Sequence, residues 1–224
     1  MISDFFGVYG ASGFGREIMP ILREQLAKLG VSKERIVFVD DNPSVSVLNG
    51  HQVMTYDEYI AVPATSRLIT LAIANSEIRS LLADKCVADG IGFVEVRANN
   101  SVILDDVIIG EGSLLAPFVT LTSNIRIGTH FHANIYSYVA HDCVIGNYVT
   151  FAPGVKCNGN IVIEDHAYLG TGAILKQGKP GKPLRIGRGA IIGAGAVVTK
   201  NVAEGITVVG NPAALLSKES LRRT

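Results

Sequence analysis

Residues 139–157 read VAHDCVIGNYVTFAPGVKC, and within them an apolar residue returns every six positions. The same repeat runs from Ile103 to Val198 and decides the fold. Successive sixth positions are apolar at Ile103, Ile109, Leu115, Leu121, Ile127, Ala133, Val139, Ile145, Phe151, Cys157, Ile163, Leu169 and Leu175. A helical period of 3.6 residues is absent. A period of six is typical of a parallel β-helix, in which short strands and turns repeat and the coils stack into one continuous core.

The positions between the apolar residues predict corners and one loop. The residue after each apolar position is mostly small or polar, as in Gly110 and Asn134, and we expect a tight corner with unusual backbone angles there. The phase of the repeat slips by one position between Leu175 and Ile186. The insertion from Gln177 to Arg185, with its Gly-Lys-Pro-Gly-Lys-Pro core, is expected to absorb the slip as a protruding loop.

Composition excludes several classes of protein. The 224 residues include 20 Lys+Arg and 20 Asp+Glu, so the chain has no net charge and lacks the basic surface typical of nucleic-acid binding. No apolar run is long enough to span a bilayer, and the start lacks the basic segment of a signal peptide. The three cysteines show no paired spacing, which favours a reducing compartment, so the cytoplasm is expected. Cys143 and Cys157 are expected to fill the core.

The first 98 residues have another pattern, in which short apolar strands alternate with helical segments. Strands are expected at 6–9, 36–39, 52–54, 68–74 and 93–96, and helical segments at 16–29, 57–61 and 77–89. This alternation predicts a small parallel sheet covered by helices. The expected domains are therefore an α/β domain over 1–98, the β-helix over 99–212, and a C-terminal tail or short amphipathic helix over 213–224.

A glycine-rich turn, Gly10-Ala-Ser-Gly-Phe-Gly15, joins the first expected strand to the first helix. Backbone amides at such a turn, together with the helix N-terminus, favour phosphate. The glycine spacing differs from the G-x-G-x-x-G fingerprint, and the small sheet argues against an NAD-type dinucleotide. Asp40 and Asp41 end the second strand, where a carboxylate can reach a ribose hydroxyl. The alternative is a tight turn followed by acidic loop residues, and we interpret the combination as a phosphate site.

Four of the five histidines have structural explanations. His51 has no partner motif and is expected at the surface. His130 and His166 are 36 residues apart, so with three hexads per coil they would stack on one corner with Tyr148 between them. This pattern favours a packed ladder over a metal site. His132 is expected to point in a different direction from His130.

His141 is the exception, because it stands two residues after the inward Val139 and should face outward from a corner. Asp142 follows, and a carboxylate there can fix the imidazole tautomer and stabilise its charged form. One coil away in either direction, the same corner carries Ser123 and Gly159, which leave room for a substrate. The alternative is an exposed corner histidine, but the His-Asp pair beside a glycine favours a catalytic role.

Four segments resemble a single family: Gly10–Glu17, His141–Gly146, Ile192–Thr199 and Gly210–Ala213. They are similar to the nucleotide-sugar N-acetyltransferases of bacterial surface-glycan synthesis, which are relatives of the sialic acid O-acetyltransferases. The resemblance covers essentially the whole chain. It implies an α/β N-terminal Rossmann-like βαβ domain, an all-β left-handed parallel β-helix, assembly as a homotrimer, and a place in the synthesis of a surface polysaccharide such as O-antigen.

The resemblance also implies roles for individual residues. The nucleoside-diphosphate amino sugar would be bound by Gly10, Ser12, Gly13, Asp40, Asp41, Asn75 and Asn134. Acetyl-CoA would be bound by Gly159, Gly170, Thr171, Ala194, Lys200 and Pro212, and no metal would be needed. His141 would be the general base, oriented by Asp142. Many relatives carry a second histidine nine residues after the first, where this chain has Thr150.

The expected reaction is acetyl transfer to the C4 amine of a 4-amino-4,6-dideoxy sugar. The neutral amine attacks the thioester and then loses a proton, and an imidazole, whose ordinary pKa is about 6.5, suits this work near neutral pH. Backbone N–H groups at glycine corners, Gly159 first, would stabilise the tetrahedral oxyanion. No acyl-enzyme is needed, and the inward Cys143 and Cys157 are not expected to act as nucleophiles.

Three alternatives stay open at this point. A sialic acid O-acetyltransferase would use the same fold and coenzyme. A zinc hydratase of the γ-carbonic anhydrase type would need three histidine ligands, and Gly146 stands where one of them belongs. A non-catalytic β-helix scaffold would not bind acetyl-CoA. The residues also leave the nucleotide open among UDP, dTDP and GDP.

Overall fold

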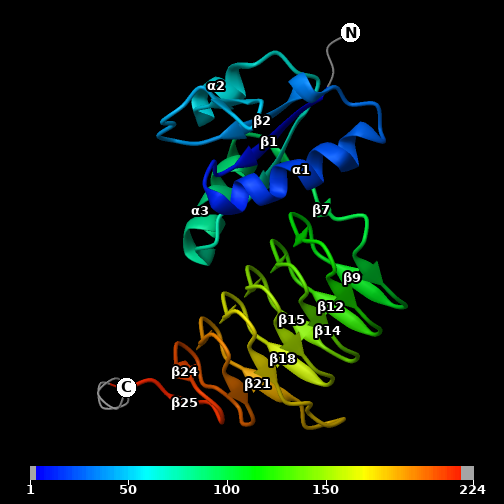
Figure 1. Cartoon of the computed structure of the whole chain (residues 1–224), viewed down its shortest axis with the longest axis vertical. Helices are drawn as coiled ribbons and strands as arrows, with labels where there is room; N and C mark the ends of the chain where they lie inside the picture. The colour runs from blue at the N-terminus through cyan, green and yellow to red at the C-terminus, as the bar shows by residue number, and fades with distance from the viewer. Residues whose placement is uncertain (1–3, 218–224) are drawn as a thin grey trace. The chain divides into compact units, whose positions relative to one another are not determined.

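The computed structural model describes residues 4–217, which belong to two compact units (Figure 1). The first unit comprises Met1–Asn99 and Glu111–Leu114, and the second comprises Asn100–Gly110 and Leu115–Thr224. The segment Glu111–Leu114 joins the first unit although the hexad pattern runs through it. Leu114 packs into the N-terminal apolar core, and the Val96 N–H donates to the Ser113 carbonyl over 3.1 Å.

A mostly parallel sheet forms the centre of the first unit. Its strands are β1 (Phe5–Tyr9), β2 (Ile36–Val39), β3 (Val47–Leu48), β4 (His51–Met54), β5 (Arg67–Leu71) and β6 (Gly92–Phe93). The strand order is β3-β4-β2-β1-β5-β6, and only the β3–β4 pair is antiparallel among these neighbours. Every residue of β1 and β2 is buried. Both strands therefore have the continuous apolar character of parallel strands that are covered on both faces.

Three helices connect these strands: α1 (Gly13–Ala27), α2 (Tyr56–Ala61) and α3 (Ser76–Ala88), with a single 3₁₀ turn at Lys33–Arg35. α1 buries Ile18, Met19, Leu22 and Leu26, which recur with helical spacing on one face. The predicted alternation of strand and helix is confirmed, as is the Rossmann-like character of the domain.

Two expected strands are wrong in detail. The strand expected at 68–74 ends at Leu71. The segment 93–96 does not form one strand; β6 ends at Phe93 and a separate strand, β7 (Val96–Arg97), follows. The side chain of Gln25 accounts for the break. It donates to the Glu95 carbonyl and accepts from the Arg97 N–H, so it takes the place of a strand partner there.

The second unit is a parallel β-helix whose strands form three sheets, each named here by one of its strands. The β14 sheet contains β8 (Val102–Ile103), β11 (Thr120–Leu121), β14 (Tyr138–Val139), β17 (Lys156–Cys157), β20 (Ile174–Leu175) and β23 (Val197–Val198). The β15 sheet contains β9 (Val107–Ile109), β12 (Ile125–Ile127), β15 (Val144–Ile145), β18 (Ile161–Ile163) and β21 (Leu184–Ile186). The β13 sheet includes β10 (Leu114–Leu115), β13 (His132–Ala133), β16 (Thr150–Phe151), β19 (Tyr168–Leu169), β22 (Ile191–Ile192) and β24 (Thr207–Val209).

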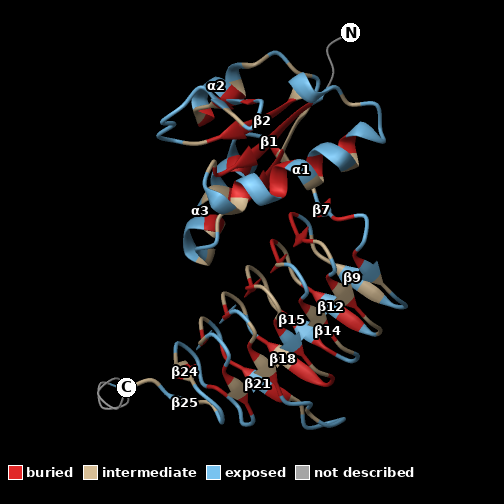
Figure 2. Ribbon diagram, in the orientation of Figure 1, coloured by how far each residue is buried: buried red, intermediate tan, exposed pale blue. Residues whose placement is uncertain are grey.

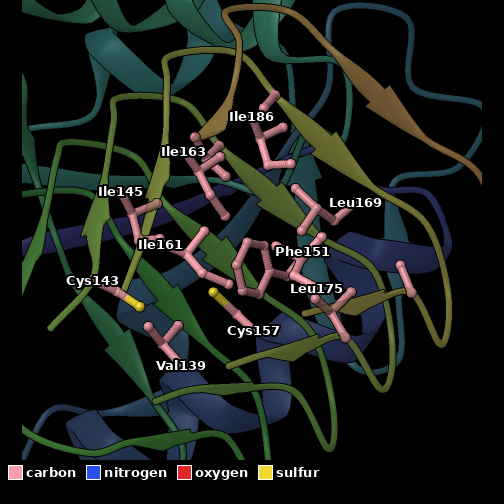
Figure 3. Packing of buried hydrophobic residues seen from close by; sticks show 14 of the residues in the cluster. Val139, Cys143, Ile145, Phe151, Cys157, Ile161, Ile163, Leu169, Leu175 and Ile186 are labelled. Carbon is pink, nitrogen blue, oxygen red and sulfur yellow. The ribbon is translucent and has the colours of Figure 1, made fainter. Parts of the chain in front are cut away.

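Each full coil consists of three hexads, so residues 18 apart lie side by side. Leu121 pairs with Val139, Val139 with Cys157, and Cys157 with Leu175. These inward residues form one apolar column, and together with the equivalent residues of the other two sheets they fill the coil (Figure 2). Figure 3 shows the ring of Phe151 among its aliphatic neighbours, and the sulfurs of Cys143 and Cys157 pointing toward one another inside the core. The predicted left-handed parallel β-helix and the inward cysteines are confirmed.

The corners of the coil differ from expectation in one respect. Positive φ angles occur every six residues, at Asp106, Gly112, Phe118, Asn124, His130, Tyr136, Asp142, Tyr148, Gly154, Asn160, His166 and Gly172. These positions lie three residues after each inward side chain, not directly after it. The small residue directly after it has another cause, since a Cβ on Gly110 would come within 2.5 Å of the Gly128 backbone. At Gly110, close stacking of successive coils and not backbone strain therefore excludes a side chain.

The insertion forms a loop that is closed by two backbone hydrogen bonds between Lys179 and Lys182. Its last two expected residues, Leu184 and Arg185, belong instead to β21. The expected C-terminal helix is also wrong over the part that the structure describes. Ala214–Leu215 is a strand, β25, that pairs antiparallel with β24, while residues 218–224 lie outside the described range.

Candidate active site

His141 stands on the turn between the β14 sheet and the β15 sheet, which we call the histidine corner. Its Nδ1 lies 2.7 Å from a carboxylate oxygen of Asp142, and both side chains are 48% exposed. Because the carboxylate accepts the Nδ1 hydrogen, the Nε2 nitrogen is left as the proton acceptor of the neutral ring. The residue pair predicted to be catalytic therefore has the tautomer that a general base requires.

Gly159 lies directly beside the imidazole, one coil further along the same corner. A Cβ built on Gly159 would come within 2.6 Å of both Cε1 and Nε2 of His141. The ring therefore packs against the Cα of Gly159, and a side chain there would displace it. Among the described residues, the Gly159 N–H has no hydrogen-bond acceptor, although its carbonyl accepts from Gly178. Gly159 itself is buried beside the ring, and the oxyanion role of its N–H stays a prediction.

Asn124 is a member of this group that the sequence reasoning missed. Its amide donates to the second carboxylate oxygen of Asp142 over 3.2 Å. Hydrogen bonds from His141 and, to a smaller extent, from Asn124 hold the pKa of the Asp142 carboxyl below its ordinary value. The signal was present in the sequence, because Asn124 and Asp142 are 18 residues apart and both adopt positive φ. Three side chains, Asn124, Asp142 and His141, thus form one hydrogen-bonded chain.

The thiols beneath this corner are structural. Cys143 lies against the carbonyls of His141 and Asn158, at 3.6 Å and 3.3 Å. Contact between the two thiols lowers the pKa of Cys143 and, together with burial, raises the pKa of Cys157. Both residues are fully buried in the core. Neither sulfur can reach a thioester at the surface, so no covalent acyl-cysteine is expected.

The glycine-rich turn opens the N-terminus of α1 to solvent. Gly10 has a φ of +106°, and a Cβ on Gly15 would fall 1.7 Å from the Gly10 carbonyl oxygen, so only glycine permits this close approach of strand and helix. Ser12 is the N-cap residue, but its side chain makes no capping hydrogen bond, and the first turn contains no acidic residue. Arg16, which the sequence reasoning did not select, extends its guanidinium to within 3.9 Å of the Cβ position of Gly13. These features suit an anion at this helix end.

The two aspartates after β2 are engaged in the turn itself. The Asp40 carboxylate accepts from the Ala11 N–H at 3.2 Å and from the Asn42 N–H at 3.0 Å. The Asp41 carboxylate accepts from the Tyr9 hydroxyl at 2.7 Å, and burial together with this bond raises the pKa of Tyr9. Asp40 therefore fixes the glycine-rich turn to the end of β2. Asp41 is exposed beside it.

Asn75 lies after β5, in the same unit, as the N-cap of α3. Its side-chain oxygen accepts from the N–H groups of Glu77 and Ile78, both at 3.0 Å. The fully buried Arg79 donates to the carbonyls of Ile73 and Ala74 and so holds the segment before Asn75. This arrangement fixes the loop that ends β5, and only the amide nitrogen of Asn75 is left free of the cap.

The residues predicted to bind acetyl-CoA are divided between two corners of the coil. Gly159 and Lys200 follow strands of the β14 sheet and lie on the histidine corner. The turn between the β13 and β14 sheets, which we call the asparagine corner, carries Asn134, Gly170, Thr171 and Ala194. Pro212 lies on neither corner, because it stands between β24 and β25 of the β13 sheet. A whole strand of the β14 sheet separates the two corners in every coil. One chain alone therefore does not gather the predicted set into one place.

The remaining histidines serve packing. His130, Tyr148 and His166 stack with ring centroids 5.1 Å and 5.2 Å apart, as predicted. His51, however, is buried and not at the surface: its Nδ1 lies 2.9 Å from the Ile36 carbonyl and its Nε2 lies 3.2 Å from Arg23. The polar partners that permit this burial come from distant positions in the chain. Over residues 4–217, no group of three His, Cys, Asp or Glu side chains is placed to hold a metal ion.

Thr150 lies on β16, in register with His132 and Tyr168 of the β13 sheet. It is therefore away from the histidine corner. No described helix has the length and apolar character needed to cross a membrane.

A β-helix built from hexads, with an outward histidine–aspartate pair at a glycine corner, defines the class of hexapeptide-repeat acyltransferases. Comparison with known proteins narrows the class. Residues 6–86 match the family model of the PglD N-terminal domain. Over 210 residues the chain is 50% identical to the GDP-perosamine N-acetyltransferase of Escherichia coli O157:H7, covering 94% of this chain and 95% of that protein.

Solved structures agree with this result. WeeI from Acinetobacter baumannii AYE is 61% identical, with a TM-score of 0.93 over 96% of this chain and 100% of that one. The acetyltransferase domain of PglB from Neisseria gonorrhoeae FA1090, in complex with acetyl coenzyme A, is 28% identical, with a TM-score of 0.83 over 96% of this chain and 100% of that one. The chain belongs to the hexapeptide-repeat family of bacterial nucleotide-sugar N-acetyltransferases, as the sequence resemblance predicted.

Proposed function

We propose that this protein transfers the acetyl group of acetyl-CoA to the C4 amine of a nucleotide-linked 4-amino-4,6-dideoxy sugar, with GDP-perosamine as the substrate. The observation that carries the proposal is the His141 imidazole, which is oriented by Asp142 and exposed over Gly159. The choice of GDP-perosamine follows from the 50% identity to the Escherichia coli enzyme of that name along almost the entire chain. An N-acetylated sugar of this kind would serve surface-polysaccharide synthesis, including O-antigen.

In this mechanism the free amine attacks the carbonyl carbon of the thioester. A C–N bond forms, and the amine proton passes to Nε2 of His141, whose Nδ1 hydrogen is held by Asp142. The oxyanion of the tetrahedral intermediate accepts a hydrogen bond from the Gly159 N–H. Collapse breaks the C–S bond, and the proton carried by His141 neutralises the departing thiolate. The products are an amide and the free thiol of coenzyme A, and the histidine returns to its starting state.

The N-terminal unit supplies the proposed nucleotide site. The diphosphate of the nucleotide-sugar would lie at the open N-terminus of α1. There Ser12 and Gly13 present uncapped N–H groups and Arg16 supplies a positive charge. Asp40 would act by holding the turn in shape, and Asp41 would face the ribose or the base. Asn75 would contribute its free amide nitrogen from the adjacent strand end.

The division of the predicted coenzyme residues between two corners supports a homotrimer. Gly159 and Lys200 lie on the histidine corner, whereas Gly170, Thr171 and Ala194 lie on the asparagine corner. A cyclic assembly of three β-helices would bring the histidine corner of one chain against the asparagine corner of the next, and would complete the acetyl-CoA groove there. Asn134 would then reach the sugar from the neighbouring subunit.

The cytoplasm is the compartment that we propose. The coenzyme and the nucleotide-sugar are both cytoplasmic metabolites, and Cys86, Cys143 and Cys157 are free thiols. No nucleic-acid or membrane partner is needed for the reaction.

The direct test follows thiol release from acetyl-CoA with GDP-, dTDP- and UDP-linked 4-amino-4,6-dideoxy sugars, with CMP-sialic acid included. Turnover with GDP-perosamine, and a loss of about 10²-fold or more in His141→Asn, is the expected result. Turnover on sialic acid alone would replace the proposal with O-acetylation. Wild-type turnover in His141→Asn would remove the general-base role, whichever sugar is accepted.

A further inference from the structure

The asparagine corner differs in charge from the other two corners of the coil. In five consecutive coils its three turn positions contain no charged side chain; they are residues 116–118, 134–136, 152–154, 170–172 and 193–195. The same positions of the histidine corner include Asp142 and Lys176. Those of the turn between the β15 and β13 sheets, here called the third corner, include Asp165 and Arg188. The asparagine corner offers no charge to a phosphate and therefore favours a neutral group.

An exposed aromatic pair stands on this uncharged corner. The rings of Phe118 and Tyr136 are stacked, with their centroids 4.7 Å apart and an angle of 4° between their planes. Phe118 is 50% exposed and Tyr136 is 62% exposed, and Ile135 on the same turn is 39% exposed. The aromatic stack of the third corner is different, because His130 at its end is buried. Apolar side chains grouped at the surface in this way are typical of a binding site.

One face of the Tyr136 ring lies on Phe118, and the next two residues along the corner are Gly154 and Gly172. The Gly154 N–H donates to the Ile135 carbonyl over 2.9 Å, so Gly154 is on the coil next to Tyr136. A Cβ built on Gly154 would lie 3.9 Å from the nearest atoms outside its own turn, and one built on Gly172 would meet nothing within 4 Å. Neither glycine places a side chain against the second face of the Tyr136 ring, and a ligand can reach that face.

Two polar groups on the same turn are free to bind a ligand. The Asn134 side-chain oxygen accepts from the Ile135 N–H at 2.8 Å. Within residues 4–217, neither the amide nitrogen of Asn134 nor the Tyr136 hydroxyl takes part in a hydrogen bond. The turn itself is fixed, because the buried Ser137 hydroxyl donates to the Ala152 carbonyl of the next coil at 3.0 Å. An aromatic face with fixed polar groups beside it suits a ring that is apolar on its faces and hydroxylated at its edge.

We propose that the Tyr136 ring, supported from behind by Phe118, packs against the sugar ring of the nucleotide-sugar and selects for the methyl group at its C6. This assignment rests on the proposed function, because it assumes that a 6-deoxy sugar is the acceptor and that Asn134 contacts it. The C–H groups of the sugar face would pack on the aromatic ring, and its edge hydroxyls would meet the Asn134 amide and the Tyr136 hydroxyl. A hydroxyl at C6 would be buried against Ile135 and Tyr136 at a cost that a methyl group avoids. Phe118 is a positioning residue, because it acts through Tyr136.

The test compares two acceptors, GDP-perosamine and the GDP-linked 4-amino-4-deoxy sugar of the same configuration that carries a hydroxyl at C6. Wild type should prefer the 6-deoxy sugar by about tenfold or more in kcat/KM. Tyr136→Gly removes the ring without backbone strain, because Tyr136 has a φ of 58°. It should raise the KM for GDP-perosamine by about tenfold, leave kcat close to that of wild type, and abolish the preference. Tyr136→Phe retains the ring and should retain the preference.

Tyr148→Gly is the matched control. Tyr148 is also a stacked tyrosine with a positive φ, but it lies on the third corner. Its loss should leave both the KM for GDP-perosamine and the preference for the 6-deoxy sugar unchanged. Phe118→Gly should raise the KM for GDP-perosamine by less than Tyr136→Gly does, because the sugar still meets the Tyr136 ring. The KM for acetyl-CoA should be the same in all of these variants.

Three results would overturn the assignment. One is equal use of the two acceptors by wild type, and another is a Tyr136→Gly variant with the KM and the preference of wild type. The third is a change of oligomeric state in Tyr136→Gly, measured by sedimentation, which would make the aromatic pair a contact between subunits. A wild type that acetylates neither sugar would reject the proposed function and this assignment with it, whereas the first three results leave the proposed function intact.

Discussion

The His141 imidazole has one side occupied by the Cα of Gly159 and one nitrogen held by Asp142. We predict that Gly159→Ala lowers turnover by about tenfold or more, because the new Cβ would fall 2.6 Å from Nε2 and push the ring from its place. Gly159 does not adopt a left-handed backbone, so the substitution should leave the melting temperature close to that of wild type. Steady-state kinetics and thermal unfolding on the same samples check both expectations.

Gly189→Ala is the matched control for this substitution. Gly189 has a φ of +60° and open space around its Cβ position. Alanine there should cost about 1 kcal/mol of stability through backbone strain while leaving turnover unchanged. If the two variants lost activity in parallel with their stability, the steric argument at Gly159 would fail.

Asn124 offers a second prediction at this scale. Asn124→Gly removes the amide that donates to Asp142 but keeps a residue that tolerates the φ of 58°. The pKa of the Asp142 carboxyl should then rise toward its ordinary value, remaining below it because the larger contribution comes from His141. In wild type the lowered pKa keeps the Asp142 carboxyl ionised as the pH falls. In Asn124→Gly the carboxyl should become protonated at a higher pH than in wild type, and its ionised contact with His141 should be lost there.

Carbon NMR of the Asp142 carboxyl measures this shift directly. Asn124→Asp provides the contrast, since a like charge would raise the pKa of Asp142 further. An Asp142 titration that is the same in wild type and in Asn124→Gly would show that the hydrogen bond has no effect on the pair.

Individual residues could be placed from the sequence where the repeat determines the direction in which a side chain points. His141, Asp142 and Gly159 could be placed because an 18-residue period determines which residues are neighbours on a corner. His51 could not, because its buried environment depends on Arg23 and the Ile36 carbonyl, which no local pattern connects to it. Long-range hydrogen-bond partners carry no periodic signal.

At the scale of elements, the turns of the β-helix use left-handed backbone at every hexad, including bulky residues such as Phe118, Tyr136 and Tyr148. We predict that Tyr148→Ala is less stable than Tyr148→Gly by about 1 kcal/mol. Both changes remove the ring of Tyr148, which stacks on His130 and on His166. Only alanine retains a Cβ in the left-handed conformation. In the middle of an ordinary strand or helix the order would be reversed.

Urea unfolding of the two variants and of wild type measures the difference. Wild type should be the most stable of the three because its aromatic ladder is intact. An alanine variant as stable as the glycine variant would show that the left-handed turn carries little strain at this position.

The elements themselves were largely predictable, and the errors share one cause. The hexad pattern predicted the coils and the three-hexad repeat, and the alternation of apolar and helical segments predicted the N-terminal sheet. The strand expected at 93–96 was wrong, and so was the expected C-terminal helix over the described residues 213–217. In both places a tertiary contact, Gln25 in one case and pairing with β24 in the other, overrides the local preference.

At the scale of the whole molecule, the site proposed here is incomplete in a single chain. His141 lies on the histidine corner and Asn134 on the asparagine corner, with a strand of the β14 sheet between them. The sequence assigned both residues to one reaction but could not show that they lie on different corners, because that depends on the direction of each turn in three dimensions. The proposed subunit interface would bring the two corners together, and it leads to a prediction that a site within one chain would not satisfy.

We predict that two inactive variants restore activity when they are mixed as subunits. His141→Asn chains retain an intact asparagine corner, and Asn134→Ala chains retain an intact histidine corner. After co-refolding in equal amounts, about a quarter of the interfaces in a cyclic trimer should combine two intact corners, so turnover should recover to about a quarter of the wild-type value. Mixing the folded variants without refolding is the control. Recovery no greater than the mean of the two variants would place the entire site within one chain and reject the shared groove.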